Sequence, residues 1–140
     1  MQLPLTGDTL LQLIPQRAPL IMVSSLEQYE EYALISSFFV QEGHILVTEE
    51  LTESGLLEHM AQSVALHTGY AYFLRKEKAP TGYIGSMQLV EIFRLPRVGD
   101  TVFTDVRIIQ EFMGVTLVEI ITKLEGEIIA TAQMKTVIAR

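Results

Sequence analysis

The spacing of apolar residues predicts one long helix in the middle of the chain. From Ser54 to Arg75, apolar and small side chains recur every three or four residues, as they do along one face of a helix. The recurring positions are Leu56, Leu57, Met60, Ala61, Val64, Thr68 and Ala71. Just before them, Thr52 and Glu53 supply a capping hydroxyl and first-turn negative charge. At about 1.5 Å per residue the helix is about 33 Å long, so it can cross a small domain.

Strand patterns fill most of the remaining sequence. One strand is expected before the helix, from Tyr29 to Val40, because its side chains alternate between two faces. Four more are expected after the helix, in segments rich in valine, isoleucine, threonine and aromatic residues. These segments are Tyr83–Phe93, Thr101–Glu111, Val115–Leu124 and Ile128–Ile138. Near the N-terminus, Thr6 to Ile14 is expected to form a short helix that ends before Pro15.

The order of these elements predicts the fold. With one strand, one long apolar helix and four antiparallel strands, both apolar surfaces are buried only if the sheet wraps around the helix. No internal repeat or linker divides the chain. We therefore expect a single hot-dog domain over residues 1–140, an α+β fold in which an antiparallel sheet wraps around one long central helix.

Composition excludes several classes of function. The 140 residues are 49% hydrophobic and 19% charged, which is typical of a folded globular protein. The net charge of −7 is unsuited to binding nucleic acid or an anionic membrane over the whole surface. The absence of cysteine excludes a disulfide scaffold, a zinc–thiolate site and a cysteine nucleophile. We recognise neither a signal peptide nor a long uncharged apolar stretch, so we expect a soluble, cytoplasmic protein.

Three histidines are candidates for chemistry, but their spacing is not that of metal ligands. Taken alone, His44 is a histidine in a loop. His59 lies about 100° around the helix from Glu58, and we expect it to be exposed or at an interface. His67 is assigned no role. The chain also contains no glycine-rich phosphate loop and no Gly-x-Ser-x-Gly motif.

A second pattern on the predicted helix marks a candidate site. Glu58, Gln62, Ala65 and Gly69 form a narrow stripe at the edge of the apolar face. A carboxylate and an amide followed by small residues suit a place where a cavity or a partner approaches the helix. A solvated helix face that happens to carry Glu and Gln explains the same pattern equally well. Periodicity alone leaves both interpretations open.

Short motifs in the chain resemble those of a known enzyme family. The helix carries Glu58-His59-Met60-Ala61-Gln62, and Gly43-His44 precedes it at the family's spacing. Two further motifs are Pro15-Gln16-Arg17-Ala18-Pro19 and Phe93-Arg94-Leu95-Pro96 with Gly99-Asp100. Together they resemble the 3-hydroxyacyl-(acyl carrier protein) dehydratases of the hot-dog superfamily. The helix motif, followed as far as Tyr70, is at least as similar to the dehydratases of aryl-polyene and related pigment pathways.

This resemblance implies an activity that converts 3-hydroxyacyl thioesters on an acyl carrier protein into trans-2-enoyl thioesters. It implies that His44 removes the proton α to the thioester carbonyl and that Glu58 helps the β-hydroxyl group leave as water. A backbone N–H near Glu53 is expected to stabilise the thioester oxygen, and Gln62 is also expected to bind the substrate. No metal or organic cofactor is needed. Two subunits share each site in this family, which implies a homodimer or a trimer of dimers.

The chain departs from the family pattern in the loops around the expected site. Ile45-Leu46 replaces Phe-Pro after the histidine, and Leu51-Thr52-Glu53 replaces a Met-Pro-Gly turn. Two other functions therefore stay open. An acyl-thioester hydrolase also uses a helix carboxylate, which activates water, but it does not need His44 at this spacing. A non-catalytic acyl-binding or structural partner would keep the fold without competent loops.

Docking of an acyl carrier protein places a further requirement on the surface. Carrier proteins are acidic, so an acidic enzyme needs a local basic patch to bind one. The candidate residues for carrier docking are Arg94, Arg97 and Lys76, with Arg75 and Lys78 beside the last.

Overall fold

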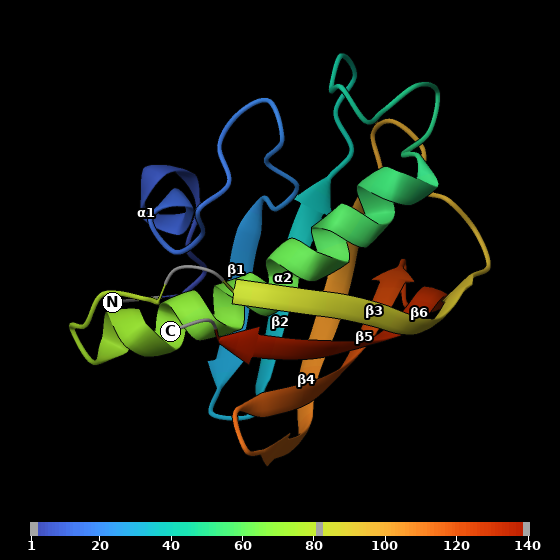
Figure 1. Cartoon of the computed structure of the whole chain (residues 1–140). Helices are drawn as coiled ribbons and strands as arrows, with labels where there is room; N and C mark the ends of the chain where they lie inside the picture. Colours follow the sequence, from blue (N-terminus) through green and yellow to red (C-terminus); the bar gives the residue numbers. More distant parts are fainter. Residues whose placement is uncertain (1–2, 81–82, 139–140) are drawn as a thin grey trace.

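Six antiparallel strands form one sheet that curls around a long helix, which confirms the predicted hot-dog fold (Figure 1). The computed structural model describes residues 3–80 and 83–138. In their order across the sheet, the strands are β1 (Ser25–Glu30), β2 (Ala33–Phe39), β4 (Thr101–Phe112), β5 (Val115–Leu124), β6 (Glu127–Ile138) and β3 (Tyr83–Ile92). The helices are α1 (Gly7–Leu11) and α2 (Glu53–Leu74). Strands β1 and β3 are therefore the two edges of the sheet.

The strand predicted from Tyr29 to Val40 is in fact the end of β1 followed by the whole of β2. The two strands form a hairpin that turns at Glu31 and Tyr32. No Gly, Pro, Asn or Asp marks this turn, so local signals do not reveal it. The sheet holds the turn in place, because the Tyr32 carbonyl oxygen accepts a hydrogen bond from the Ile108 N–H of β4 at 2.8 Å. The later strands and α2 end within one residue of their predicted bounds.

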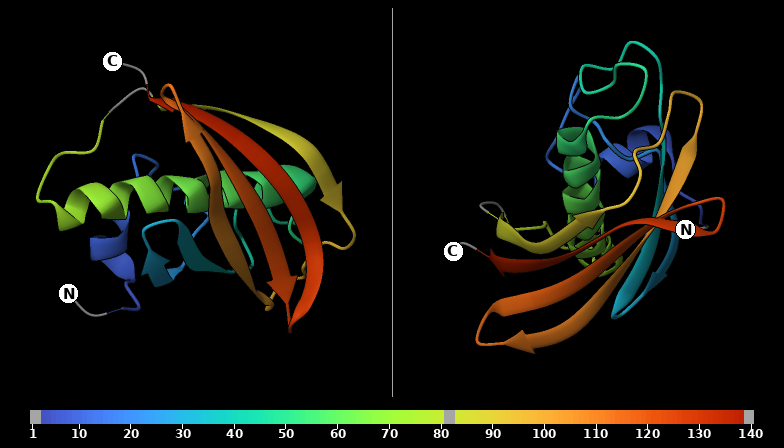
Figure 2. Two further views of the ribbon diagram at one scale, coloured as in Figure 1. Left: turned by 90° about the horizontal axis from the view of Figure 1, so that it is seen from below. Right: turned by 90° about the vertical axis from the view of Figure 1, so that its right-hand side faces the viewer.

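Helix α2 lies in the concave face of the sheet and is buried on most of its sides (Figure 2). It begins with a capped turn, since the Thr52 hydroxyl accepts a hydrogen bond from the Gly55 N–H at 3.1 Å. Leu56, Met60 and Val64 contribute to the apolar core between helix and sheet. No helix within residues 3–80 and 83–138 is long and apolar enough to cross a membrane.

The segment between α1 and β1 covers a second side of α2. At Gly69 the two backbones touch, and a Cβ atom there would overlap the carbonyl oxygen of Leu13. Only glycine permits so close an approach. The stripe from Glu58 to Gly69 is therefore not a solvated face along its whole length, although Ala65 and Gly69 also line a hollow of about 440 Å³. The chain's own N-terminal segment packs across α2 along this stripe.

His59 is completely buried, whereas the sequence predicted an exposed or interfacial side chain. Its Nδ1 donates to the Met22 carbonyl oxygen at 2.7 Å, and its Nε2 accepts from the Thr104 hydroxyl at 2.8 Å. Thr104 in turn accepts from the Thr122 hydroxyl at 2.8 Å. These directions follow because a carbonyl oxygen only accepts and a neutral imidazole carries one proton. Helical periodicity missed this burial because Met22 is 37 residues away in the chain.

The buried ring predicts a pH-dependent stability. Burial lowers the pKa of His59 from 6.5 to about 4, so the unfolded chain binds a proton between these values and the folded protein does not. The free energy of unfolding is therefore fully present above pH 6.5 and falls by up to about 3 kcal/mol as the pH drops to 4. We expect urea unfolding at pH 7.5 and 5.0 to differ less for His59→Gln than for the native protein. An unchanged pH dependence would contradict a buried neutral ring.

Candidate functional site

Gln62 fastens residues 20–22, a segment that we call the strap, to helix α2. The Gln62 side chain is completely buried. Its amide nitrogen donates to the Leu20 carbonyl oxygen at 2.7 Å, and its amide oxygen accepts from the Met22 N–H at 2.8 Å. The same nitrogen donates to the Glu58 carboxylate at 3.0 Å. Gln62 thus holds the strap and orients Glu58, while its contact with substrate stays a prediction.

His44 holds the strap from the loop that precedes α2. Its Nε2 lies 3.1 Å from the carbonyl oxygen of Ile21, and its Nδ1 lies 3.0 Å from the backbone nitrogen of Leu46. The ring also packs edge-on against Phe38, with the ring centroids 6.0 Å apart. Sequence reasoning singled out His44 but missed Leu46, because the contribution of Leu46 comes from its backbone and not from its side chain.

Of the two predicted catalytic residues, His44 binds the strap directly, whereas Glu58 is linked to it only through Gln62. The backbone groups of Leu20 and Met22 bind α2, and the carbonyl between them, that of Ile21, binds His44. The imidazole and the Gln62 amide, which also holds Glu58, therefore bind successive groups of the same backbone segment. Both side chains are only partly exposed. Within residues 3–80 and 83–138, no cluster of three or more His, Asp or Glu side chains is placed to hold a metal ion.

Glu53, the predicted position of the oxyanion donor, begins α2 with its side chain exposed. The Gly55 N–H already donates to the Thr52 hydroxyl, and the Leu56 N–H donates to the Thr52 carbonyl oxygen at 2.9 Å. The positive end of the helix dipole thus lies at the surface near position 53. This location suits the stabilisation of a negatively charged oxygen, and the role itself stays a prediction.

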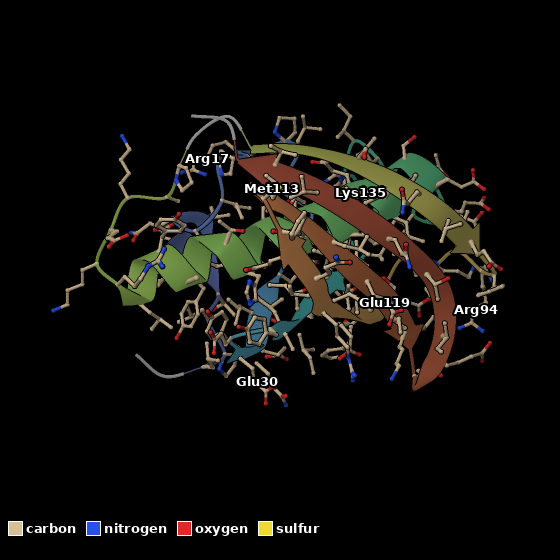
Figure 3. All side chains as sticks on the ribbon, turned by 60° about the horizontal axis from the view of Figure 1, so that its bottom comes forward. Arg17, Glu30, Arg94, Met113, Glu119 and Lys135 are labelled. Atoms are coloured by element: carbon tan, nitrogen blue, oxygen red, sulfur yellow. The ribbon has the colours of Figure 1, made fainter. Side chains whose placement is uncertain are left out.

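The basic residues predicted to dock a carrier protein do not form one patch. Arg94 and Arg97 lie between β3 and β4 and line a surface hollow of about 780 Å³ together with Glu49, Glu50 and Asp100. Lys76 follows the C-terminus of α2, about 30 Å away along the helix. In Figure 3, Arg94 lies at one end of the molecule and the light-green end of α2 at the other. The sequence motifs did not reveal this separation, because they do not show that the full length of α2 lies between Lys76 and the two arginines.

Comparison with known proteins identifies a family. The family model described as ApeP-like, ApeP dehydratase, matches residues 9–139. No curated protein matches the chain. Among solved structures, the dehydratase heterocomplex ApeI:P from Xenorhabdus doucetiae superposes with a TM-score of 0.85 and 15% identity, over 100% of this chain and 93% of that one.

Two further structures share the fold. The uncharacterized protein PH1136 from Pyrococcus horikoshii gives a TM-score of 0.71 with 11% identity, over 99% of this chain and 96% of its own. The protein smu.793 from Streptococcus mutans UA159, bound to acetyl CoA, gives 0.65 with 11% identity, over 81% and 86%. Since the family match extends over nearly all of the chain, the protein belongs to the ApeP-like dehydratase family and is a hot-dog dehydratase.

Proposed function

We propose that this dehydratase removes water from 3-hydroxyacyl thioesters held on an acyl carrier protein and releases trans-2-enoyl thioesters. The observation that carries the proposal is that two side chains able to move protons are both linked to the strap. They are a carboxylate on the central helix, Glu58, and an imidazole from the preceding loop, His44, and both are partly exposed. Dehydration needs groups that move a proton from the α-carbon and to the β-hydroxyl, and these two are the candidates.

The thioester carbonyl makes the α-proton removable, because negative charge that develops at the α-carbon spreads onto the carbonyl oxygen. A hydrogen-bond donor near that oxygen lowers the barrier. We propose that the first turn of α2, at Glu53, takes part in this stabilisation, since the helix dipole is positive there. Gln62 supports the reaction by holding Glu58 at 3.0 Å from its amide nitrogen.

Replacement of either member of the pair tests the reaction. We expect His44→Ala and Glu58→Gln each to slow formation of the enoyl product from a carrier-bound 3-hydroxyacyl thioester at least about 100-fold. Glu77→Gln, a change of the same kind at an exposed position beyond α2, serves as the matched control and should keep the native rate. The measurement is enoyl absorbance over time.

Other products in the same assay separate the remaining functions. Release of free thiol without enoyl product would indicate an acyl-thioester hydrolase. A folded native protein that turns over no carrier-bound substrate of any chain length would indicate a non-catalytic acyl-binding partner. Either result would overturn the proposed reaction.

We also propose that a second hot-dog chain completes the site. His44 binds the strap directly and Glu58 reaches it only through Gln62, so we place a substrate that uses both groups between two chains. Edge strand β3 offers a surface for pairing, since it exposes unpaired backbone and large apolar side chains such as Leu89, which is 69% exposed, and the following Phe93. The similar structure ApeI:P is a dehydratase heterocomplex, which supports the assembly of this chain with a second chain.

The oligomeric state tests this pairing. We expect the native protein to behave as a homodimer or a larger assembly in light scattering, and Leu89→Asp to shift it toward monomer because a charge would be buried at the edge. The matched control is Met113→Asp, at the exposed β4–β5 turn, which should leave the mass unchanged. A monomeric native chain would exclude a homodimer, and the second subunit would then have to be a different protein.

We propose that the hollow at Arg94 and Arg97 docks the acidic carrier protein. The hollow lies beside the loop that leads into α2, because Leu51 donates to the Pro96 carbonyl oxygen at 2.9 Å. A carrier bound there is near the N-terminus of α2, where the thioester is expected. The ion pair of Arg94 with Glu127 is long, at 4.0 Å, and exposed, so it leaves the guanidinium able to bind another anion.

Charge reversal tests the docking surface. We expect Arg94→Glu with Arg97→Glu to raise KM several-fold for carrier-bound substrate and to leave KM for a small soluble thioester unchanged, because only the carrier is acidic. Lys76→Glu, at the far end of α2, is the control with the same charge change and should have little effect. Equal changes for both substrates would refute carrier docking at this hollow.

A further inference from the structure

Leu46, two residues after His44, is fastened to the first turn of α2. Its carbonyl oxygen accepts two hydrogen bonds from Thr52, one from the backbone N–H and one from the side-chain hydroxyl, each at 3.0 Å. The same hydroxyl accepts from the Gly55 N–H at 3.1 Å. One threonine therefore joins the loop that carries His44 to the start of the helix that carries Glu58.

Gly55 provides the space for this contact. A Cβ atom at position 55 would lie 3.1 Å from the Cβ atom of Leu46, 3.2 Å from the Leu46 carbonyl oxygen and 2.6 Å from Cδ1 of Leu51. Any larger residue would therefore push Leu46 away from the helix. The hydrogen bonds of Thr52 and the missing side chain at Gly55 both favour the same close approach of Leu46 to α2.

The backbone between His44 and Thr52 forms a closed turn. Val47 and Leu51 are paired in an isolated antiparallel bridge. The Val47 N–H also donates to the His44 carbonyl oxygen at 3.0 Å. The bonds from Thr52 to Leu46 close this turn at the point where it meets α2, so they connect the backbone of the histidine to the helix.

Leu46 and Thr52 are also two of the positions at which the chain departs from the dehydratase pattern, which has proline at both. Proline has neither an N–H nor a hydroxyl group, so proline at position 52 could donate neither bond to Leu46. Thr52 has a φ of −70°, which proline also adopts, so the backbone itself does not require threonine. In this chain, the hydrogen bonds of Thr52 hold a loop that lacks the fixed φ of the two prolines.

Leu46 lies directly against the imidazole of His44. Its backbone nitrogen is 3.0 Å from Nδ1, on the opposite side of the ring from the Ile21 carbonyl oxygen, which is 3.1 Å from Nε2. A displacement of Leu46 therefore removes one of the contacts that orient the ring. A displacement of about 1 Å in a group that moves a proton can slow a reaction about 100-fold.

Resting on the proposed dehydration, we propose that Thr52 is a positioning residue for His44. Its two hydrogen bonds fix the Leu46 peptide, and the Leu46 peptide fixes the imidazole in the place from which it moves a proton. Thr52 acts on the reaction only through Leu46. A misplaced imidazole slows proton transfer but leaves the other contacts of the substrate intact, so the loss of this support lowers kcat more than it changes KM.

Substitutions at position 52 separate positioning from helix capping. Thr52→Ser keeps the hydroxyl group and should stay within about twofold of the native kcat, whereas Thr52→Val should lose about 10- to 100-fold with little change in KM. Thr52→Gly also lacks the hydroxyl group, but glycine is an acceptable N-cap, so we expect a Tm near the native value and a kcat as low as that of Thr52→Val. The matched control is Thr131→Val, at a partly buried position in β6, which should keep the native kcat.

Two results would overturn the role of Thr52 while leaving the dehydration in place. One is a native kcat in both Thr52→Val and Thr52→Gly, since Thr52 would then only cap the helix. The other is a loss in Thr52→Ser as large as that in Thr52→Val, since the hydroxyl group would then have no part in the effect.

NMR of the His44 ring provides a readout that does not depend on turnover. The ring C–H resonances of His44, assigned by their loss in His44→Ala, should shift or broaden in Thr52→Val and Thr52→Gly and keep their native positions in Thr52→Ser. Those of His67, in the second half of α2, should not move in any of the three. Unchanged His44 resonances in Thr52→Val would refute the placement of the ring by Thr52. A native protein that forms no enoyl product would overturn the proposed dehydration instead, and the NMR comparison would still test the placement.

Discussion

Every polar side chain that α2 carries into the interior must find a partner there, because an unpaired buried polar group costs free energy. Two of these groups, His59 and Gln62, are completely buried and find their partners on the backbone of the strap. The strap cannot shift without breaking several buried hydrogen bonds at once. Its path across the helix is therefore the constraint on which the candidate site depends.

The path of the strap explains the arrangement of the site. Gln62 binds the strap from α2 at Leu20 and Met22. The Ile21 carbonyl between them binds His44 of the loop instead. The imidazole and the Gln62 amide therefore bind successive groups of one backbone segment. Both ring nitrogens of His44 are also engaged, one at the Ile21 carbonyl oxygen and the other at the Leu46 N–H.

The stripe on α2 shows how far a sequence pattern can be interpreted alone. Its carboxylate, amide and small residues were compatible with a cavity or with a solvated face. In the structure, the same chain approaches the stripe at two points, through hydrogen bonds at Gln62 and through backbone contact at Gly69. The buried amide provides hydrogen bonds to the approaching backbone, and the glycine leaves the space that a Cβ atom would fill. Both residues therefore allow a second backbone to lie close to α2.

Periodicity and short motifs were enough to predict the long helix, the later strands, the hot-dog fold and the dehydratase resemblance. Each is encoded by periodicity or by residues close together in the chain. The three-dimensional structure was needed to find the β1–β2 turn, the burial of His59 and the separation of Lys76 from Arg94. These depend on segments that meet from far apart, such as Met22 and Gln62, which are 40 residues apart, and on backbone groups that every residue type shares. The type of a side chain does not reveal which backbone N–H or carbonyl group packs beside it in the folded protein. Those contacts determine the chemistry of the site.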